Sequence, residues 1–115
     1  VDVFFDKENV YQPDLVFVAS TNSSIIQEKG IIGTPDLVAE IISPSSSYID
    51  RYSKKEKYEQ FRVPEYWIVD PANKTLEIFV LTAYHQYDLL LSLAIRGKVI
   101  SKLLKEMTFE LAEIF

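Results

Sequence analysis

Two Pro-Asp steps in this chain place carboxylates at the start of, or inside, segments that otherwise resemble buried strands. The first is Gln-Pro-Asp-Leu-Val-Phe-Val at residues 12–18, and the second is Thr-Pro-Asp-Leu-Val-Ala-Glu-Ile-Ile-Ser at residues 34–43. A carboxylate among buried residues is costly unless it is paired, hydrogen-bonded or bound to a metal. Two such strands side by side would form a metal site, for which Asp14, Asp36 and Glu40 are the candidate ligands.

Strand periodicity separates these three carboxylates. Alternate side chains of a strand share a face, so Asp36, Val38, Glu40 and Ile42 are expected on the same side. Glu40 is the most unusual of them, because its same-face neighbours are apolar and another apolar residue would cost less there. For Asp14 and Asp36 a simple role at a strand start after proline competes with metal binding, and for Asp36 it is favoured.

Two lysines fall on the packing side of a helix predicted over residues 51–61. At 100° per residue, Lys54 and Lys57 share a face with the helix's large aromatic residues. A lysine on a packing face either lays its stem over the core edge or reaches an anionic group. Since the helix directly follows the strand that carries Glu40, either lysine is able to point back towards that carboxylate.

Two carboxylates on adjacent strands with a nearby lysine suit metal-assisted hydrolysis of a phosphodiester. Carboxylate oxygens are hard ligands of the kind that bind Mg²⁺. The metal lowers the pKa of a bound water and offsets charge on the phosphoryl oxygens. The lysine orients that water or stabilises the developing negative charge.

Further motifs follow at defined spacing. Asp-x-x-x-Lys-x-x-x-Tyr occupies residues 50–58, and Val-Pro-Glu-Tyr-Trp-Ile-Val-Asp-Pro occupies residues 63–71. With the two Pro-Asp segments, this series resembles the Uma-type "putative restriction endonuclease" family, formerly a domain of unknown function, in the PD-(D/E)XK nuclease superfamily. The resemblance covers roughly positions 10 to 81. A lone Pro-Asp would carry no weight, but the order and spacing of the whole series are specific.

The resemblance implies roles for individual residues. Asp14 and Glu40 correspond to the metal ligands, and the expected catalytic set is Asp14, Glu40 and Lys54. The superfamily's lysine would stand two residues after the glutamate, but Ile42 occupies that place. Lys54 on the helix is the substitute, as in superfamily members whose lysine has migrated.

Asp36 and Lys57 remain accessory candidates for the same site. The resemblance further implies Mg²⁺ or Mn²⁺ as cofactor, nucleic acid (DNA in the first place) as substrate, and a homodimer. The competing hypothesis is a catalytically inactive relic, or an oligomerising assembly module with the same fold. A DNA-binding module without cleavage is the weakest alternative.

The expected fold is α+β and restriction-endonuclease-like, with a mixed β-sheet, one main crossover helix and a single domain over residues 1–115. Since the chain starts inside a strand, an N-terminal helix region that family members carry is expected to be missing. A crossover helix makes the strands on either side of it parallel. The expected strands are 1–6 and 10–19 as a hairpin, 35–43, 65–70, 76–81, 84–91 and 97–104, with a loop over 20–33, a helix over 51–61 capped by Asp50, and a terminal helix over 111–115.

Bulk composition limits the class of protein. The chain has 115 residues, a net charge of −5 and no cysteine, so disulfides and thiolate metal sites are excluded. No apolar run approaches the roughly 20 residues that cross a bilayer, and a cytoplasmic location is expected. The acidic balance argues against a simple DNA binder, although it argues less against a nuclease whose metal ions neutralise clustered carboxylates.

Overall fold

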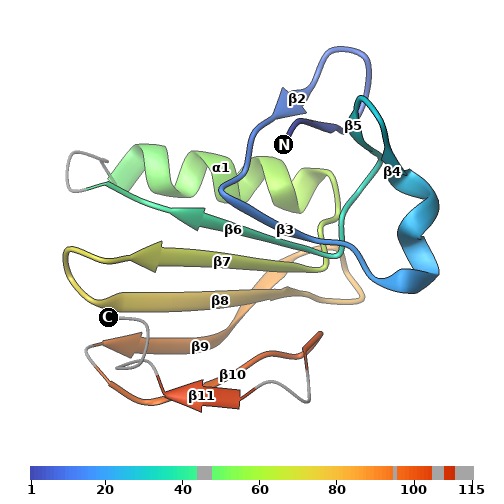
Figure 1. Ribbon diagram of the computed structural model, residues 1–115. Helices are drawn as coiled ribbons and strands as arrows, with labels where there is room; N and C mark the ends of the chain where they lie inside the picture. Colours follow the sequence, from blue (N-terminus) through green and yellow to red (C-terminus); the bar gives the residue numbers. More distant parts are fainter. Residues whose placement is uncertain (44–47, 95, 105–107, 111–115) are drawn as a thin grey trace.

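The computed structural model describes residues 1–43, 48–94, 96–104 and 108–110, arranged as shown in Figure 1. The strands form a five-stranded, a four-stranded and a two-stranded sheet. In chain order the elements are β1 (Val3–Phe4), β2 (Val10–Tyr11), β3 (Leu15–Phe17), the 3₁₀ helix η1 (Ser20–Ile25), β4 (Ile26–Gln27), β5 (Gly30–Ile32), β6 (Leu37–Ile41), α1 (Tyr48–Gln60), β7 (Glu65–Asp70), β8 (Thr75–Leu81), β9 (Tyr87–Ala94), β10 (Lys98–Ile100) and β11 (Thr108–Glu110). This part of the chain therefore has the α+β architecture that the sequence predicts.

The five-stranded sheet has the order β3-β6-β7-β8-β9. β6 and β7 are parallel, with Leu37 opposite Glu65 and Ile41 opposite Val69, and α1 connects them as the expected crossover helix. The other neighbouring pairs in this sheet are antiparallel, and β7, β8 and β9 form the expected meander. The parallel pair thus joins the strand that carries Glu40 to the helix that carries the candidate lysines.

The helix α1 starts earlier than the sequence suggested. It begins at Tyr48, so the expectation that Asp50 is the N-cap is wrong, and Asp50 lies in the first turn. After the last helical residue, Arg62 adopts a left-handed φ of 62°, and the Val63 N–H donates to the Tyr58 carbonyl at 3.0 Å. This is the usual way in which a helix end satisfies its free carbonyls.

The segment 10–19, expected as one strand, is divided between two sheets. β2 pairs with β1, whereas β3 pairs with β6. The break falls at the buried Pro13. Proline has no N–H to donate and a fixed φ, so one ladder does not continue across it. As a result, β3 and the preceding Asp14 lie at the edge of the large sheet.

Residues 20–33 contain more structure than the predicted loop with one helical turn. η1 is followed by the antiparallel pair β4–β5, and β5 also pairs in parallel with β1. Gly30 has a φ of +150°, and a Cβ there would lie 2.6 Å from the Asp2 carbonyl oxygen. Only glycine therefore permits this close approach of β5 to the N-terminal segment.

The last third of the chain departs from expectation mainly at element ends. β9 begins at Tyr87 rather than at residue 84, because residues 82–86 form a turn in which His85 has a φ of 62° and its N–H donates to the Thr82 carbonyl. His85 is exposed, as expected.

Asp70 caps its turn as predicted, since its carboxylate accepts from the N–H and the side-chain amide of Asn73. The strand expected over 97–104 shortens to β10, and the helix expected over 111–115 lies outside the described residues.

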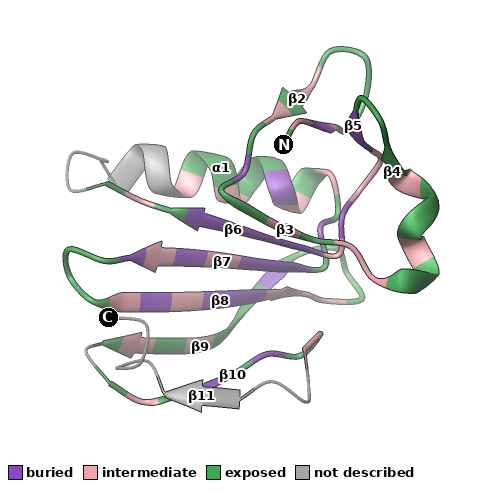
Figure 2. Cartoon of the chain, viewed as in Figure 1, coloured by how far each residue is buried: buried purple, intermediate pink, exposed green. Residues whose placement is uncertain are grey.

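Both faces of the large sheet are covered. On one face Tyr58 of α1 packs with residues of β6, β7, β8 and β9, and on the other Val99 of β10 packs with Leu76 and Ile78. Figure 2 shows the buried residues concentrated in β6, β7 and β8. The four-stranded sheet adjoins the end of α1, where Phe5 stacks on Phe61 at a centroid distance of 4.6 Å. None of the helices in the described ranges is long and apolar enough to cross a membrane.

The carboxylate of Glu65 is buried on the sheet face away from Tyr58, which the sequence did not indicate. Glu65 is 2% exposed, and its oxygens accept from the Trp67 indole at 2.6 Å, the Ser101 hydroxyl at 2.6 Å and the Leu103 N–H at 3.0 Å. These hydrogen bonds connect the segment after β10 to the sheet. Glu65 is therefore assigned a structural role.

Glu65→Ala is expected to lower the free energy of unfolding by about 2–4 kcal/mol, because it leaves three donors unpaired, two of them on largely buried side chains. Urea denaturation followed by circular dichroism measures this loss. Glu56→Ala, at an exposed position of α1, is the control and should change stability by less than about 0.5 kcal/mol. Equal effects of the two substitutions would contradict the structural role of Glu65.

Candidate active site

The sheet register places the two candidate metal ligands next to each other. In the antiparallel pair β3–β6, Leu15 lies opposite Ala39, so the next position of the same register brings Asp14 opposite Glu40. Side chains at directly opposed positions have Cβ atoms about 4.5–5.5 Å apart. The Asp14 Oδ2 atom also accepts the Ile41 N–H at 2.7 Å, which fixes this carboxylate at the edge of β6. The two Pro-Asp segments are thus the adjacent strands that the sequence suggested.

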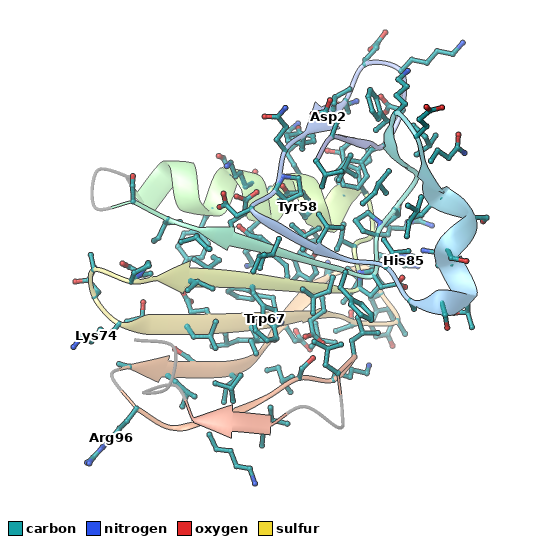
Figure 3. The ribbon with its side chains drawn as sticks, in the orientation of Figure 1. Asp2, Tyr58, Trp67, Lys74, His85 and Arg96 are labelled. Carbon is teal, nitrogen blue, oxygen red and sulfur yellow. The ribbon has the colours of Figure 1, made fainter. Side chains whose placement is uncertain are left out.

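Two side chains of α1 contact the carboxylate of Glu40. The Tyr58 hydroxyl donates to Oε1 at 2.7 Å, and the Lys54 Nζ lies 3.4 Å from Oε2. Glu40 is only 4% exposed and Tyr58 is fully buried, whereas the side chain of Lys54 remains 51% exposed. Figure 3 shows Tyr58 at the interface between α1 and the sheet. The structure therefore brings Asp14, Glu40 and Lys54 together, at a site open to solvent on the Asp14 and Lys54 side.

The helix spacing explains why both contacts come from α1. Lys54 and Tyr58 are four residues apart, and residues at this spacing are neighbours on one helix face. The sequence had suggested that Tyr58 contributes an apolar packing surface, and its hydroxyl as a partner of Glu40 was missed. The signal was present, because a tyrosine one turn after a lysine that faces a carboxylate brings a donor to the same place.

Burial dominates the electrostatics of Glu40. Burial raises the pKa of its carboxyl above the ordinary value of 4.5, the Tyr58 hydrogen bond and the Lys54 ammonium lower it, and the Asp14 charge raises it, with a net upward shift. For Tyr58, burial and the adjacent Glu40 carboxylate raise the hydroxyl pKa far above 10. Tyr58 therefore remains a protonated donor to Glu40 at any physiological pH.

The raised pKa of Glu40 predicts a pH-dependent stability in metal-free buffer. The folded chain keeps this proton to higher pH than the unfolded chain, so the free energy of unfolding should fall as pH rises from about 4.5 through the raised pKa. Glu40→Gln removes this contribution and should be more stable than the wild type above that range. Urea denaturation from pH 4 to 8 with EDTA measures the difference, and Glu56→Gln is the exposed control. The same pH dependence in Glu40→Gln and wild type would contradict the prediction.

The accessory candidates lie outside this group of side chains. The Asp36 Oδ2 atom accepts the Ala19 N–H at 2.8 Å and the Asn22 amide at 3.3 Å, which connects the start of β6 to η1. Lys57 is exposed, and the ion pair to Glu40 comes from Lys54 instead. Ile42 packs at the edge of the core that contains Tyr58. Asp36 thus makes its hydrogen bonds to Ala19 and Asn22, and Lys54 is the lysine that contacts Glu40.

The donor set fits a small divalent cation. Within the described ranges no group of three or more His, Cys, Asp or Glu side chains gathers at one place, so Asp14 and Glu40 are the protein carboxylates available there. Mg²⁺ is commonly held by one or two carboxylates together with waters and substrate phosphates. A carboxylate has about four acceptor positions, so the hydrogen bonds already made by these two leave room for a metal.

A groove of about 590 Å³ adjoins Asp14. It runs between β3 and the β4–β5 pair, and its charged lining residues are Asp2, Asp14, Glu28 and Lys29. Gln12, also in the lining, donates to Asp2 at 2.6 Å. Of the three candidate residues only Asp14 lines the groove, so the groove provides space for a substrate next to Asp14. Its acidic lining would repel a phosphate unless a cation offset the charge.

Comparison with known proteins identifies a family model and solved structures that are similar to this chain. The family model described as Uma2, putative restriction endonuclease, matches residues 1–110. Among solved structures, the chain is similar to a putative nuclease belonging to DUF820 from Anabaena variabilis ATCC 29413, with a TM-score of 0.65 and 19% sequence identity. That match covers 92% of this chain and 60% of the other, so this chain spans about 60% of that protein's length. No curated protein matches the chain.

At 19% identity, the structural likeness supports the fold and confirms the restriction-endonuclease-like α+β architecture that the sequence predicts. The family model supports the resemblance found in the motifs, and it extends over almost all of the chain. The protein belongs to the Uma2 family of putative restriction endonucleases.

Proposed function

We propose that this domain is a nuclease of the PD-(D/E)XK type, which hydrolyses DNA with Mg²⁺ or Mn²⁺ bound by Asp14 and Glu40. The observation that carries the proposal is the convergence of three side chains. Asp14 lies opposite Glu40 in the sheet register, and Lys54 lies 3.4 Å from Glu40. The family description and the similar solved structure, which is described as a putative nuclease, both support a nucleic acid as substrate.

Each side chain has a separate task in this proposal. Asp14 is exposed and held by the Ile41 N–H, so it presents a fixed carboxylate to the groove. Glu40 supplies a second carboxylate whose position is set by α1. A bound Mg²⁺ would supply Lewis-acid chemistry at the phosphate and at the attacking water. Lys54, which is half exposed, is free to move from Glu40 to the phosphate and stabilise its developing negative charge.

The acidic groove makes nucleic-acid binding dependent on metal in this proposal. Asp2, Asp14 and Glu28 outnumber Lys29 in its lining. Without a divalent cation, these carboxylates repel the phosphates of a substrate. Substrate affinity should therefore rise with the divalent cation and vanish with EDTA.

The direct test is cleavage of plasmid DNA, single-stranded DNA and RNA by the purified chain with Mg²⁺, Mn²⁺ or EDTA. Cleavage that requires the divalent cation is the expected result. The absence of cleavage of all three substrates with either metal would remove the enzymatic claim.

An inactive assembly module is the alternative that one observation favours. Leu15, Phe17 and Ile41 are 57%, 39% and 47% exposed, and they lie along the edge pair β3–β6. Exposed apolar residues at a sheet edge are typical of a surface that pairs with another chain, such as the partner of a homodimer. Calorimetric titration with Mn²⁺ separates the two functions, because only the nuclease requires Mn²⁺ binding that depends on Glu40.

A further inference from the structure

The two oxygens of the Glu40 carboxylate have different surroundings. Oε1 accepts a hydrogen bond of 2.7 Å from the fully buried Tyr58, and Oε2 lies 3.4 Å from Lys54, which is half exposed. A buried donor is fixed, whereas an exposed ammonium on a flexible stem is easily displaced. Oε2 is thus the oxygen more readily released to a metal, whereas Tyr58 keeps one of the two acceptor positions of Oε1 occupied.

The Tyr58 ring has little freedom to withdraw its hydroxyl. It packs against Tyr66 at a centroid distance of 5.2 Å, Tyr11 at 5.8 Å and Phe5 at 6.0 Å. Tyr66 lies in β7 of the large sheet, whereas Tyr11 lies in β2 of the four-stranded sheet and Phe5 directly follows its β1, so two separate parts of the fold hold Tyr58 in place. Breaking the bond to Oε1 would leave a buried hydroxyl without a partner, which is costly.

We propose that Tyr58 is a positioning residue that occupies Oε1, makes Glu40 a one-oxygen ligand through Oε2, and thereby favours small six-coordinate cations over Ca²⁺. Mg²⁺ demands octahedral geometry with ligands at about 2.0–2.1 Å, which a single carboxylate oxygen satisfies. Ca²⁺ takes six to eight oxygens at about 2.3–2.6 Å and often uses both oxygens of one carboxylate. This selectivity rests on the proposed metal site at Asp14 and Glu40.

The test compares the affinities of the full chain for Mn²⁺ and Ca²⁺ in wild type and Tyr58→Phe. We expect Tyr58→Phe to lose about tenfold or more in Mn²⁺ affinity, the usual effect of removing a group that orients a ligand, while Ca²⁺ affinity stays equal or rises. Mn²⁺ binding is followed by electron paramagnetic resonance, and Ca²⁺ binding by competition against Mn²⁺. Neither readout requires cleavage activity.

Tyr87→Phe is the matched control. Tyr87 belongs to the same core cluster and donates a buried hydrogen bond of 2.6 Å to the Val63 carbonyl, so this substitution also removes one buried phenolic hydroxyl. It should leave both metal affinities unchanged. A general loss of stability would instead affect the two variants alike.

The outcomes separate the inference from the proposed function. An unchanged ratio of Mn²⁺ to Ca²⁺ affinity in Tyr58→Phe, with both ions bound, overturns the positioning role alone. Failure of the wild type to bind Mn²⁺ overturns the metal site and the inference together. Changed selectivity without any cleavage supports the inference and counts against the nuclease.

A measurement on the wild type covers the case in which Tyr58→Phe does not fold. With tyrosine labelled by ¹³C at Cζ, the Tyr58 resonance should keep its hydrogen-bonded shift when Mg²⁺ is added. Loss of that shift on Mg²⁺ addition would mean that Glu40 releases Tyr58 and uses both oxygens, which overturns the proposal.

Discussion

Glu40→Gln and Asp14→Asn are each expected to reduce Mg²⁺-dependent DNA cleavage at least about a thousandfold, equivalent to about 4 kcal/mol of activation free energy. Both substitutions remove one negative charge and keep the side-chain shape. The amide oxygen introduced at position 40 can still accept from Tyr58, and the one introduced at position 14 can still accept from the Ile41 N–H. The loss would therefore report the missing metal ligand rather than a disturbed fold. Initial cleavage rates over a range of Mg²⁺ concentrations measure it.

Asp36→Asn is the matched control, because it makes the same change at the other Pro-Asp step. Its amide oxygen can still accept the Ala19 N–H, and its structural contacts lie away from the carboxylate pair. We expect cleavage within about threefold of the wild type, since its distance from the site leaves little electrostatic coupling. If Asp36→Asn were as damaging as Asp14→Asn, the assignment of the ligands would be wrong.

Lys54→Met is expected to lower the cleavage rate by about a hundredfold to a thousandfold, the usual effect of removing one group that stabilises transition-state charge. Mn²⁺ affinity should not fall with it. Lys54 competes with a metal for Oε2 of Glu40, and a unit charge about 4 Å away contributes about 1 kcal/mol in water-like surroundings, so Mn²⁺ should bind up to about fivefold tighter. Parallel calorimetry and cleavage assays test this separation of binding from chemistry.

Lys57→Met is the control for this experiment. Lys57 carries the same charge on the same helix, but it is exposed and does not form the ion pair with Glu40. We expect cleavage close to the wild-type rate. A larger effect of Lys57→Met than of Lys54→Met would identify Lys57 as the functional lysine.

The placement of the candidate side chains could be predicted because strand and helix periodicities are local properties. Alternation along residues 34–43 indicated that Glu40 faces the same side as Val38, and the buried Val38 packs with Tyr58 as this requires. The helix period indicated that Lys54 points the same way. The parallel pairing of β6 and β7 followed from the length of the crossover. Each of these inferences needs only the backbone geometry of one element or one connection.

The partners of buried polar groups were not predictable in this way. Glu65 was expected only as the start of a strand, yet it is nearly fully buried and accepts from Ser101 and Leu103, 36 and 38 residues away. The division of residues 10–19 between two sheets depends on which strand is available on each side of Pro13. Such contacts arise between elements that are distant in the sequence, and no local pattern specifies them.

The sequence by itself determined the family, the fold class and the carboxylates that share a strand face, because motif spacing and side-chain alternation are written in consecutive residues. Only the tertiary structure decided that Asp14 lies opposite Glu40, that Lys54 rather than Lys57 reaches it, and that Asp36 hydrogen-bonds to Ala19 and Asn22. It alone revealed that Tyr58 occupies one oxygen of Glu40. The physical reason is that burial and hydrogen-bond partners depend on packing between β3, β6 and α1, which local periodicity does not contain.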